Sequence, residues 1–297
     1  MGTGSLVFQV ATIVAPLFLI VSIGYLYGAR HRPEMQITNR LIMDVFMPAL
    51  IFSVMIGDDF HIGQYYWLMI GGAALMLISG LLAYLLASAM GFSWRSFVPP
   101  AMFSNWANLG IPLYVLTLGE VALGGGIMLI VVGNVLLFTI GTYIFSDKLS
   151  GFEVLRTPII IAVLLGILFN LTSFPVPELV AKPIVMLGQV TIPLMLFSLG
   201  VRLTRVDWSD FNVGLVMAVF CPVVGVPLAL LICQILPLSE LNQNILILFG
   251  VLPPAVVNFM LAEQYDCEAE KVASMVLVGN LASIVSIPVV LFLLLSA

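Results

Sequence analysis

Two stretches of the chain combine asparagine, glycine and proline in a pattern suited to binding an anion. The first reads FSNWANLGIP at 103–112, and the second reads FGVLPPAVVN at 249–258. Proline inside a helix removes one backbone hydrogen bond and clashes with the preceding turn, and glycine weakens the helix further. We therefore expect both helices to break, with Pro112 and Pro254 near the first turn of the helix that leaves each break. The free N–H groups at such a helix start carry partial positive charge.

Six residues of these stretches are candidates for binding a substrate. Amide side chains donate and accept hydrogen bonds, so they orient a carboxylate without placing a full charge in an apolar interior. Glycine, which has no side chain, allows a ligand to approach. The alternative is that proline and asparagine only kink the two helices for packing. The candidates are Asn105, Asn108, Gly110, Pro112, Pro254 and Asn258.

Two acids within apolar stretches are possible proton-coupling residues, because an ionisable group in hydrocarbon is costly and therefore suggests a function. They are Asp44 and Glu263. Asp44 has an alternative role as an ion-pair partner of Arg40, which lies four residues earlier. Glu263 has an alternative role as a solvated residue at the cytoplasmic mouth of its helix.

No pattern in the chain indicates an enzyme or a metal site. His31 and His61 fall in expected loops without a second ligand at helical spacing. The three cysteines lack metal-ligand spacing and are expected to be packing residues. There is no HExxH motif, no nucleophile–base pair and no pair of aspartates inside an apolar segment. We therefore expect no catalytic residue, no cofactor and no bound metal.

The helices that hold the candidate residues are expected to cross a membrane. Apolar residues make up 62% of the chain and charged residues 8%, which is too few charges to cover a water-soluble protein or to bind nucleic acid. A spanning helix needs about 20 apolar residues to cross about 30 Å of hydrocarbon. The first such run has no basic residue before it, so we expect a spanning helix there and not a cleaved signal peptide. The ten expected spans are residues 8–28, 36–56, 65–90, 96–117, 121–146, 157–174, 181–200, 211–235, 242–264 and 269–295.

Basic residues predict how these spans are oriented, because Lys and Arg beside a spanning helix stay on the cytoplasmic side. Of the ten basic residues, only Lys182 flanks an even-numbered connection. We therefore expect both termini outside the cytoplasm and the loop at 147–156 inside. The nine basic residues of the odd-numbered connections are Arg30, Arg32, Arg40, Arg95, Lys148, Arg156, Arg202, Arg205 and Lys271.

An internal repeat divides the chain into a first half at 1–150 and a second half at 151–297. PALIFS at 48–53 matches PLMLFS at 193–198, 145 positions later, and VVGN at 131–134 matches LVGN at 277–280, 146 positions later. Because each half has five helices, an odd number, the second half should be inverted relative to the first. The broken fourth and ninth helices should then meet at their breaks, where unpaired backbone is buried or lines a wet cavity. Inverted halves of this kind are typical of transporters and favour stepwise transport over an open channel.

The chain resembles the auxin efflux carrier family, which includes plant auxin carriers and bacterial carriers of small organic acids. The resemblance rests on APLFLIVSIGYLYG at 15–28, NRLIMDVFMPALIF at 39–52, SNWANLGIP at 104–112 and LPPAVVNFMLAEQYD at 252–266. It implies an all-α crossover fold like that of bile acid symporters and sodium–proton antiporters. Helices 1, 2, 6 and 7 would form a scaffold and the homodimer contact, and helices 3–5 and 8–10 would form a mobile transport domain.

The same resemblance implies a secondary carrier of a small organic anion, such as a mono- or dicarboxylate or an indole acid, working by an elevator motion in the inner membrane of a bacterium. The asparagine of the family's fourth helix falls on Asn105 or Asn108, and both stay open. Related crossover carriers hold sodium through an acid at the break of helix nine, where this chain has Pro253, Pro254 and Asn258. Protons are therefore favoured over sodium. A sodium-coupled symporter and a membrane receptor without transport activity are the alternatives, and membrane lipid and the carboxylate are the expected partners.

Overall fold

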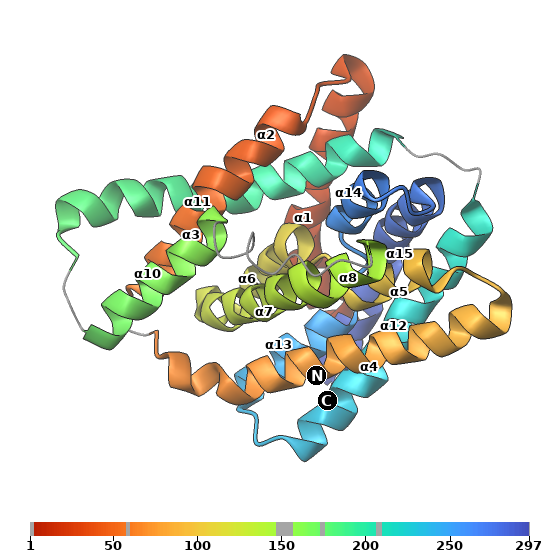
Figure 1. Cartoon of the computed structure of the whole chain (residues 1–297). Coiled ribbons are helices and arrows are strands. Elements are labelled where there is room, and N and C mark those ends of the chain that lie inside the picture. The colour runs from red at the N-terminus through yellow and green to blue at the C-terminus, as the bar shows by residue number, and fades with distance from the viewer. Residues whose placement is uncertain (1–2, 58–59, 147–156, 173–175, 206–209, 297) are drawn as a thin grey trace.

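The computed structural model describes residues 3–57, 60–146, 157–172, 176–205 and 210–296, and these residues form a bundle of helices (Figure 1). No strand occurs among them, so the predicted all-α class is confirmed within this part of the chain. The expected cytoplasmic loop at 147–156 lies outside the described residues. Within the described ranges, seven helical stretches are long and apolar enough to cross a membrane, namely Val10–His31, Ile37–Met55, Ile62–Met90, Glu120–Ser146, Glu178–Arg202, Phe211–Ile235 and Ala269–Ser296.

One group of helices comes from the first part of each sequence half. Within this group α1 packs along α11, and α3 packs against both α10 and α11. The group consists of α1 (Thr3–His31), α2 (Gln36–Leu41), the π-helical turn η1 (Ile42–Phe46), α3 (Met47–Met55), α10 (Pro158–Thr172), α11 (Glu178–Arg202) and η6 (Leu203–Arg205).

The remaining helices form a second group. Here α4 packs against α5 and α7, and α12 packs against α13 and α15. The group consists of η2 (Ile62–Tyr65), α4 (Tyr66–Met90), α5 (Trp94–Met102), η3 (Trp106–Gly110), α6 (Ile111–Leu118), η4 (Glu120–Ala122), α7 (Leu123–Leu136), η5 (Leu137–Gly141), α8 (Thr142–Ser146), α12 (Phe211–Ile235), α13 (Glu240–Gly250), α14 (Val256–Gln264) and α15 (Ala269–Ser296).

The contact between α1 and α11 depends on two glycines. A Cβ atom on Gly200 would lie 1.9 Å from the carbonyl oxygen of Val21, and a Cβ atom on Gly24 would lie 2.1 Å from that of Phe197. Membrane helices commonly pack through small residues, because lipid tails are as apolar as side chains and burial alone does not drive helices together. The two helices therefore form a close seam that leaves no room for a side chain.

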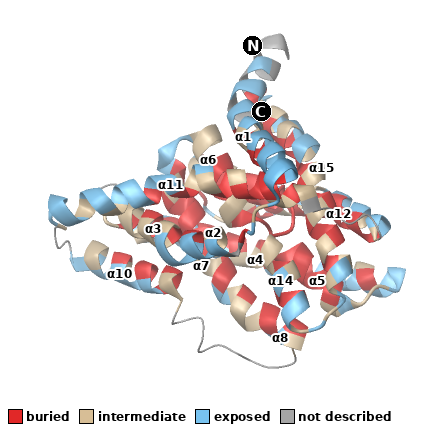
Figure 2. Ribbon diagram, turned by 90° about the horizontal axis from the view of Figure 1, so that it is seen from above, coloured by how far each residue is buried: buried red, intermediate tan, exposed pale blue. Residues whose placement is uncertain are grey.

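Buried residues gather in the middle of the molecule, and exposed ones lie on its outer helices (Figure 2). Many of the exposed side chains are large and apolar. Leu179 on α11, for example, is 87% exposed. A surface this apolar is suited to lipid and not to water.

The first turns of α1 lie beside the last turns of α15 in both views (Figures 1 and 2). The two helices also pack against each other. The beginning and the end of the described chain therefore lie at the same side of the molecule.

Two of the expected spans are interrupted, as predicted. The segment expected at 96–117 contains α5, a break and then η3 and α6, and the segment expected at 242–264 contains α13, a break and then α14. The first break lies at 103–105, before the position that the proline and glycine pattern indicates. Pro112 occupies the first turn of α6, as predicted, but the π-helical turn η3 separates α6 from the break.

Candidate functional site

The two breaks lie against each other and pair through their backbones. The N–H of Asn105 donates to the carbonyl of Pro253 at 2.7 Å, and the N–H of Ala255 donates to the carbonyl of Phe103 at 2.9 Å. Between these bonds Ser104 and Pro254 form an isolated antiparallel bridge. Backbone groups that have lost their helical partners are thus satisfied across the contact, which we call the crossing.

Asn258 holds the two sides of the crossing together. Its Nδ2 donates to the carbonyls of Phe103 at 2.8 Å and Ala255 at 2.9 Å. The residue is completely buried, and its Oδ1 has no partner among the described residues. The sequence pattern nominated Asn258 as a ligand, whereas its amide nitrogen here bonds to the backbone of both breaks.

Asn105 is also engaged in holding the crossing. Its Nδ2 donates to Oδ1 of Asn280 at 2.9 Å, and the Nδ2 of Asn280 donates to the carbonyls of Pro254 at 3.0 Å and Val276 at 2.7 Å. Asn280, on α15, was not a candidate in the sequence. Its signal was the repeated VVGN and LVGN pattern, which places an asparagine at matching positions in both halves.

The helices that leave the crossing begin with unpaired backbone donors. The N–H groups of Ala107 and Asn108 in η3, and of Val256 and Val257 in α14, form no hydrogen bond within the described part of the chain. All four residues are partly exposed, although the breaks before them are buried. Two helix starts with free donors and partial positive charge therefore remain accessible beside the crossing.

Asn108 differs from the other two candidate asparagines. It is partly exposed in η3, and its side chain forms no hydrogen bond to any residue that the structure describes. Of the two alternatives that the sequence left open, Asn105 is buried in the crossing and Asn108 keeps a free amide. The side chain of Asn108 is therefore available to bind a ligand.

Gly110 and the two prolines are buried and not exposed to a ligand. A Cβ atom on Gly110 would lie 3.0 Å from Cδ1 of Leu252 and 3.3 Å from the hydroxyl of Tyr114, so this glycine allows close packing. The Tyr114 hydroxyl, which the sequence pattern missed, is itself buried without a partner among the described residues. Pro254 lies in its break just before α14.

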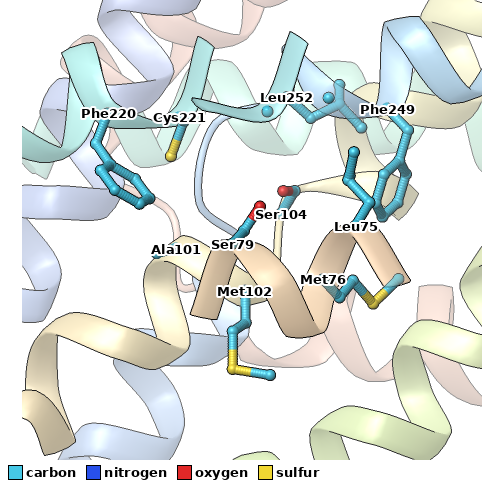
Figure 3. Close-up of a pocket in the computed structure, with 12 residues that line it drawn as sticks. Leu75, Met76, Ser79, Ala101, Met102, Ser104, Phe220, Cys221, Phe249 and Leu252 are labelled. Carbon is cyan, nitrogen blue, oxygen red and sulfur yellow. The ribbon is translucent and has the colours of Figure 1, made fainter. Parts of the chain in front are cut away.

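A small cavity of about 10 Å³ lies on another side of the crossing, between α4, α5, α12 and α13 (Figure 3). The hydroxyls of Ser79 and Ser104 and the thiol of Cys221 lie around it (Figure 3). None of the six candidate residues lines it. The cavity has room for about one water molecule and is too small for an organic acid.

The two candidate acids lie away from the crossing contacts. Asp44 is exposed in η1, and Glu263 is exposed in the last turn of α14, at the end opposite the break. The structure contains no ion pair between Asp44 and Arg40, so that alternative role is not observed among the described residues. No group of three His, Cys, Asp or Glu within the described ranges is arranged to hold a metal ion.

A different acid connects the loop before α15 to α5. Glu268 accepts hydrogen bonds from the hydroxyl of Ser96 and the ammonium of Lys271. Partial burial raises the pKa of the Glu268 carboxyl, but the bonds from Lys271 and Ser96 outweigh burial and hold this pKa below its ordinary value. The charged carboxylate of Glu268 therefore links α5 to the start of α15 through hydrogen bonds.

Comparison with known proteins supports a transport role. Residues 148–291 match the model of a family described as membrane transport protein. The chain is 23% identical over 296 residues to an uncharacterized transporter of Methanocaldococcus jannaschii, a match that covers 93% of this chain and 96% of that protein. It is 26% identical over 295 residues to an uncharacterized transporter of Methanothermobacter thermautotrophicus, covering 93% of this chain and 95% of the relative.

Proposed function

We propose that the protein is a secondary carrier of a small organic anion, because residues 148–291 match a family of membrane transport proteins and the sequence resembles the auxin efflux carriers. The carboxylate of the substrate binds at the starts of η3 and α14, beside the crossing. The substrate class is a mono- or dicarboxylate or an indole acid. The membrane is the inner membrane of the cell.

The observation that carries this proposal is the set of free donors at the crossing. Ala107, Asn108, Val256 and Val257 each keep a backbone N–H that pairs with no described residue, and the Asn108 amide adds a side-chain donor. Helix starts bind anions because their N–H groups and the helix dipole both favour negative charge. A site made of dipoles and one amide attracts a carboxylate without placing a lysine or arginine in the membrane.

The movement we propose is an elevator motion of the second helix group against the first. In this arrangement the chain crosses the membrane ten times, as inverted halves at 1–150 and 151–297. The seven long spans are joined by α10 and by the two broken pairs, α5 with α6 and α13 with α14. The side-by-side ends of α1 and α15 support an even number of crossings. The first group, with α1, α3, α10 and α11, is the scaffold.

Protons are the proposed coupling ion, with Asp44 and Glu263 as the candidate carriers. Prolines occupy the break before α14 and Asn258 lies in the first turn of α14, where a sodium-coupled symporter would be expected to have an acid. Sodium-coupled transport remains the second candidate function. A sodium gradient that accelerates uptake at constant pH and membrane potential would favour it over proton coupling.

Thermal-shift measurements of the purified protein against a panel of malonate, malate, other short carboxylates and indole acids test the proposal. A ligand present at about 100 times its dissociation constant stabilises a protein by about 2.7 kcal/mol. We expect at least one acid to raise the melting temperature and to accumulate in proteoliposomes. A panel in which no acid does either would contradict the carrier function, and stabilisation without uptake would favour a receptor.

The scaffold also offers the surface for a proposed homodimer. Its helices α10 and α11 carry exposed apolar side chains, including Leu171 and Leu179. Native mass spectrometry in mild detergent should show two copies, and a monomer under all such conditions would remove this part of the proposal.

A further inference from the structure

Arg202, at the end of α11, is a partly buried cation. Its guanidinium forms no hydrogen bond or ion pair with any residue that the structure describes. Asp44 lies on η1, which packs against α11, but the two residues form no ion pair. A desolvated guanidinium is costly unless an anion accompanies it.

Three further residues share the face of α11 that ends at Arg202. Thr191, Met195 and Ser198 lie eleven, seven and four positions before it, which is the spacing of one helix face. Thr191 and Ser198 are 0% and 3% exposed, and neither hydroxyl has a partner among the described residues. A row of unsatisfied donors along one buried face indicates polar partners that this conformation lacks.

The helix that carries this face, α11, contacts both helix groups. α11 belongs to the scaffold, yet it also packs against η3, which carries Asn108, and against α6. We propose that the Thr191–Ser198–Arg202 face of α11 is the path of the anion, with Arg202 as its entrance at the cytoplasmic side. This rests on the proposed carrier function and names the route to the same site.

The chemistry of the face suits the passage of a carboxylate. Arg202 raises the local concentration of anions by its charge, and the two hydroxyls replace lost water with neutral donors that bind an anion weakly enough to release it. When the second helix group slides, the face is uncovered from one end. The two hydroxyls then bond to the passing anion, which supplies the partners that they lack in the arrangement described here.

Thiol labelling tests this path without knowledge of the substrate. Ser198→Cys is made in a background carrying Cys221→Ala, Cys233→Ala and Cys267→Ala, and reacted in proteoliposomes with the anionic sulfonatoethyl methanethiosulfonate or its cationic trimethylammonioethyl analogue. We expect the anionic reagent to be favoured, and Arg202→Gln to lower the ratio of anionic to cationic rates by about tenfold. Arg202→Lys should keep the ratio. Arg202→Met serves as the neutral variant if Arg202→Gln does not fold.

Two substitutions elsewhere in α11 serve as controls. Lys182→Gln removes an exposed cation that pairs with Glu178 at 2.8 Å at the other end of α11, and it should leave the ratio unchanged. Val190→Cys, on an exposed face of α11, should show no preference for the anionic reagent. A Ser198→Cys thiol that reacts with neither reagent, or a ratio that the neutral Arg202 variants do not change, would overturn the path. Because thermal shifts with carboxylates are measured on unmodified protein, failure of the path and failure of the carrier function are distinguishable.

Discussion

At the scale of single residues, the asparagines of the crossing have two different tasks. Asn105 and Asn258 bond to the opposite break or to Asn280, whereas Asn108 bonds to no described residue. The sequence could predict that these amides matter, because each lies in an apolar segment that also contains a helix-breaking proline. It could not predict the division, because the partner of Asn258 in the first break is 155 positions away and that of Asn105 is 175 positions away.

Replacing Asn258 by alanine should therefore affect stability more than ligand contact. Asn258→Ala leaves the carbonyl of Phe103 without this donor in a buried place. We expect a loss of about 1–3 kcal/mol in the free energy of unfolding, seen as a lower melting temperature in detergent. Asn108→Ala is the matched control and should melt like the wild type. Equal melting temperatures for both variants would show that the Asn258 bonds do not stabilise the crossing.

At the scale of elements, the breaks show what a proline pattern can and cannot indicate. Pro112 lies in the first turn of α6, as such a pattern predicts, but the first break occurs at Phe103 to Asn105. The reason is pairing with the second break, which satisfies backbone groups that a continuous helix would otherwise use. The prolines can be read from the sequence, but the segment that pairs with each break cannot.

The seam between α1 and α11 gives a prediction at this scale. Gly200→Ala places a Cβ atom 1.9 Å from the carbonyl oxygen of Val21, a backbone atom that no rotamer change can move. Overpacking of this kind costs about 1–3 kcal/mol or more, so we expect a lower melting temperature and less monodisperse protein in size-exclusion chromatography. Gly63→Ala is the control, since a Cβ atom there has nothing within 4 Å. Wild-type behaviour of Gly200→Ala would contradict the close contact between α1 and α11.

At the scale of the whole molecule, fold class and orientation are predicted mainly from the composition of the chain and the placement of its charges. The all-α class follows from long apolar runs, and seven of them appear as continuous helices in the part of the chain that the structure describes. The ten-span inverted arrangement stays a prediction. Three of the ten expected spans are too short to be identified by length, because two are broken and the third, α10, is a short helix.

Cysteine labelling in intact cells tests the predicted orientation. Gly2→Cys should react with an impermeant maleimide without permeabilisation, because the even-numbered connections and termini lack basic residues apart from Lys182. Glu270→Cys, an exposed position at the start of α15 beside Lys271, should react only after permeabilisation. The reverse pattern would place both termini inside.

The affinity of variants at Asn108 tests the central proposal most directly, with an acid identified by the thermal-shift panel as the ligand. If the free Asn108 amide orients the carboxylate, Asn108→Ala should lose about 1–3 kcal/mol of binding free energy, a drop of roughly tenfold or more in affinity. Asn108→Asp should fold and fail to bind, because its own carboxylate competes with the anion for the helix starts. Affinities equal to wild type for both variants, measured by isothermal titration calorimetry on monodisperse protein, would contradict the assignment of the substrate site to the crossing.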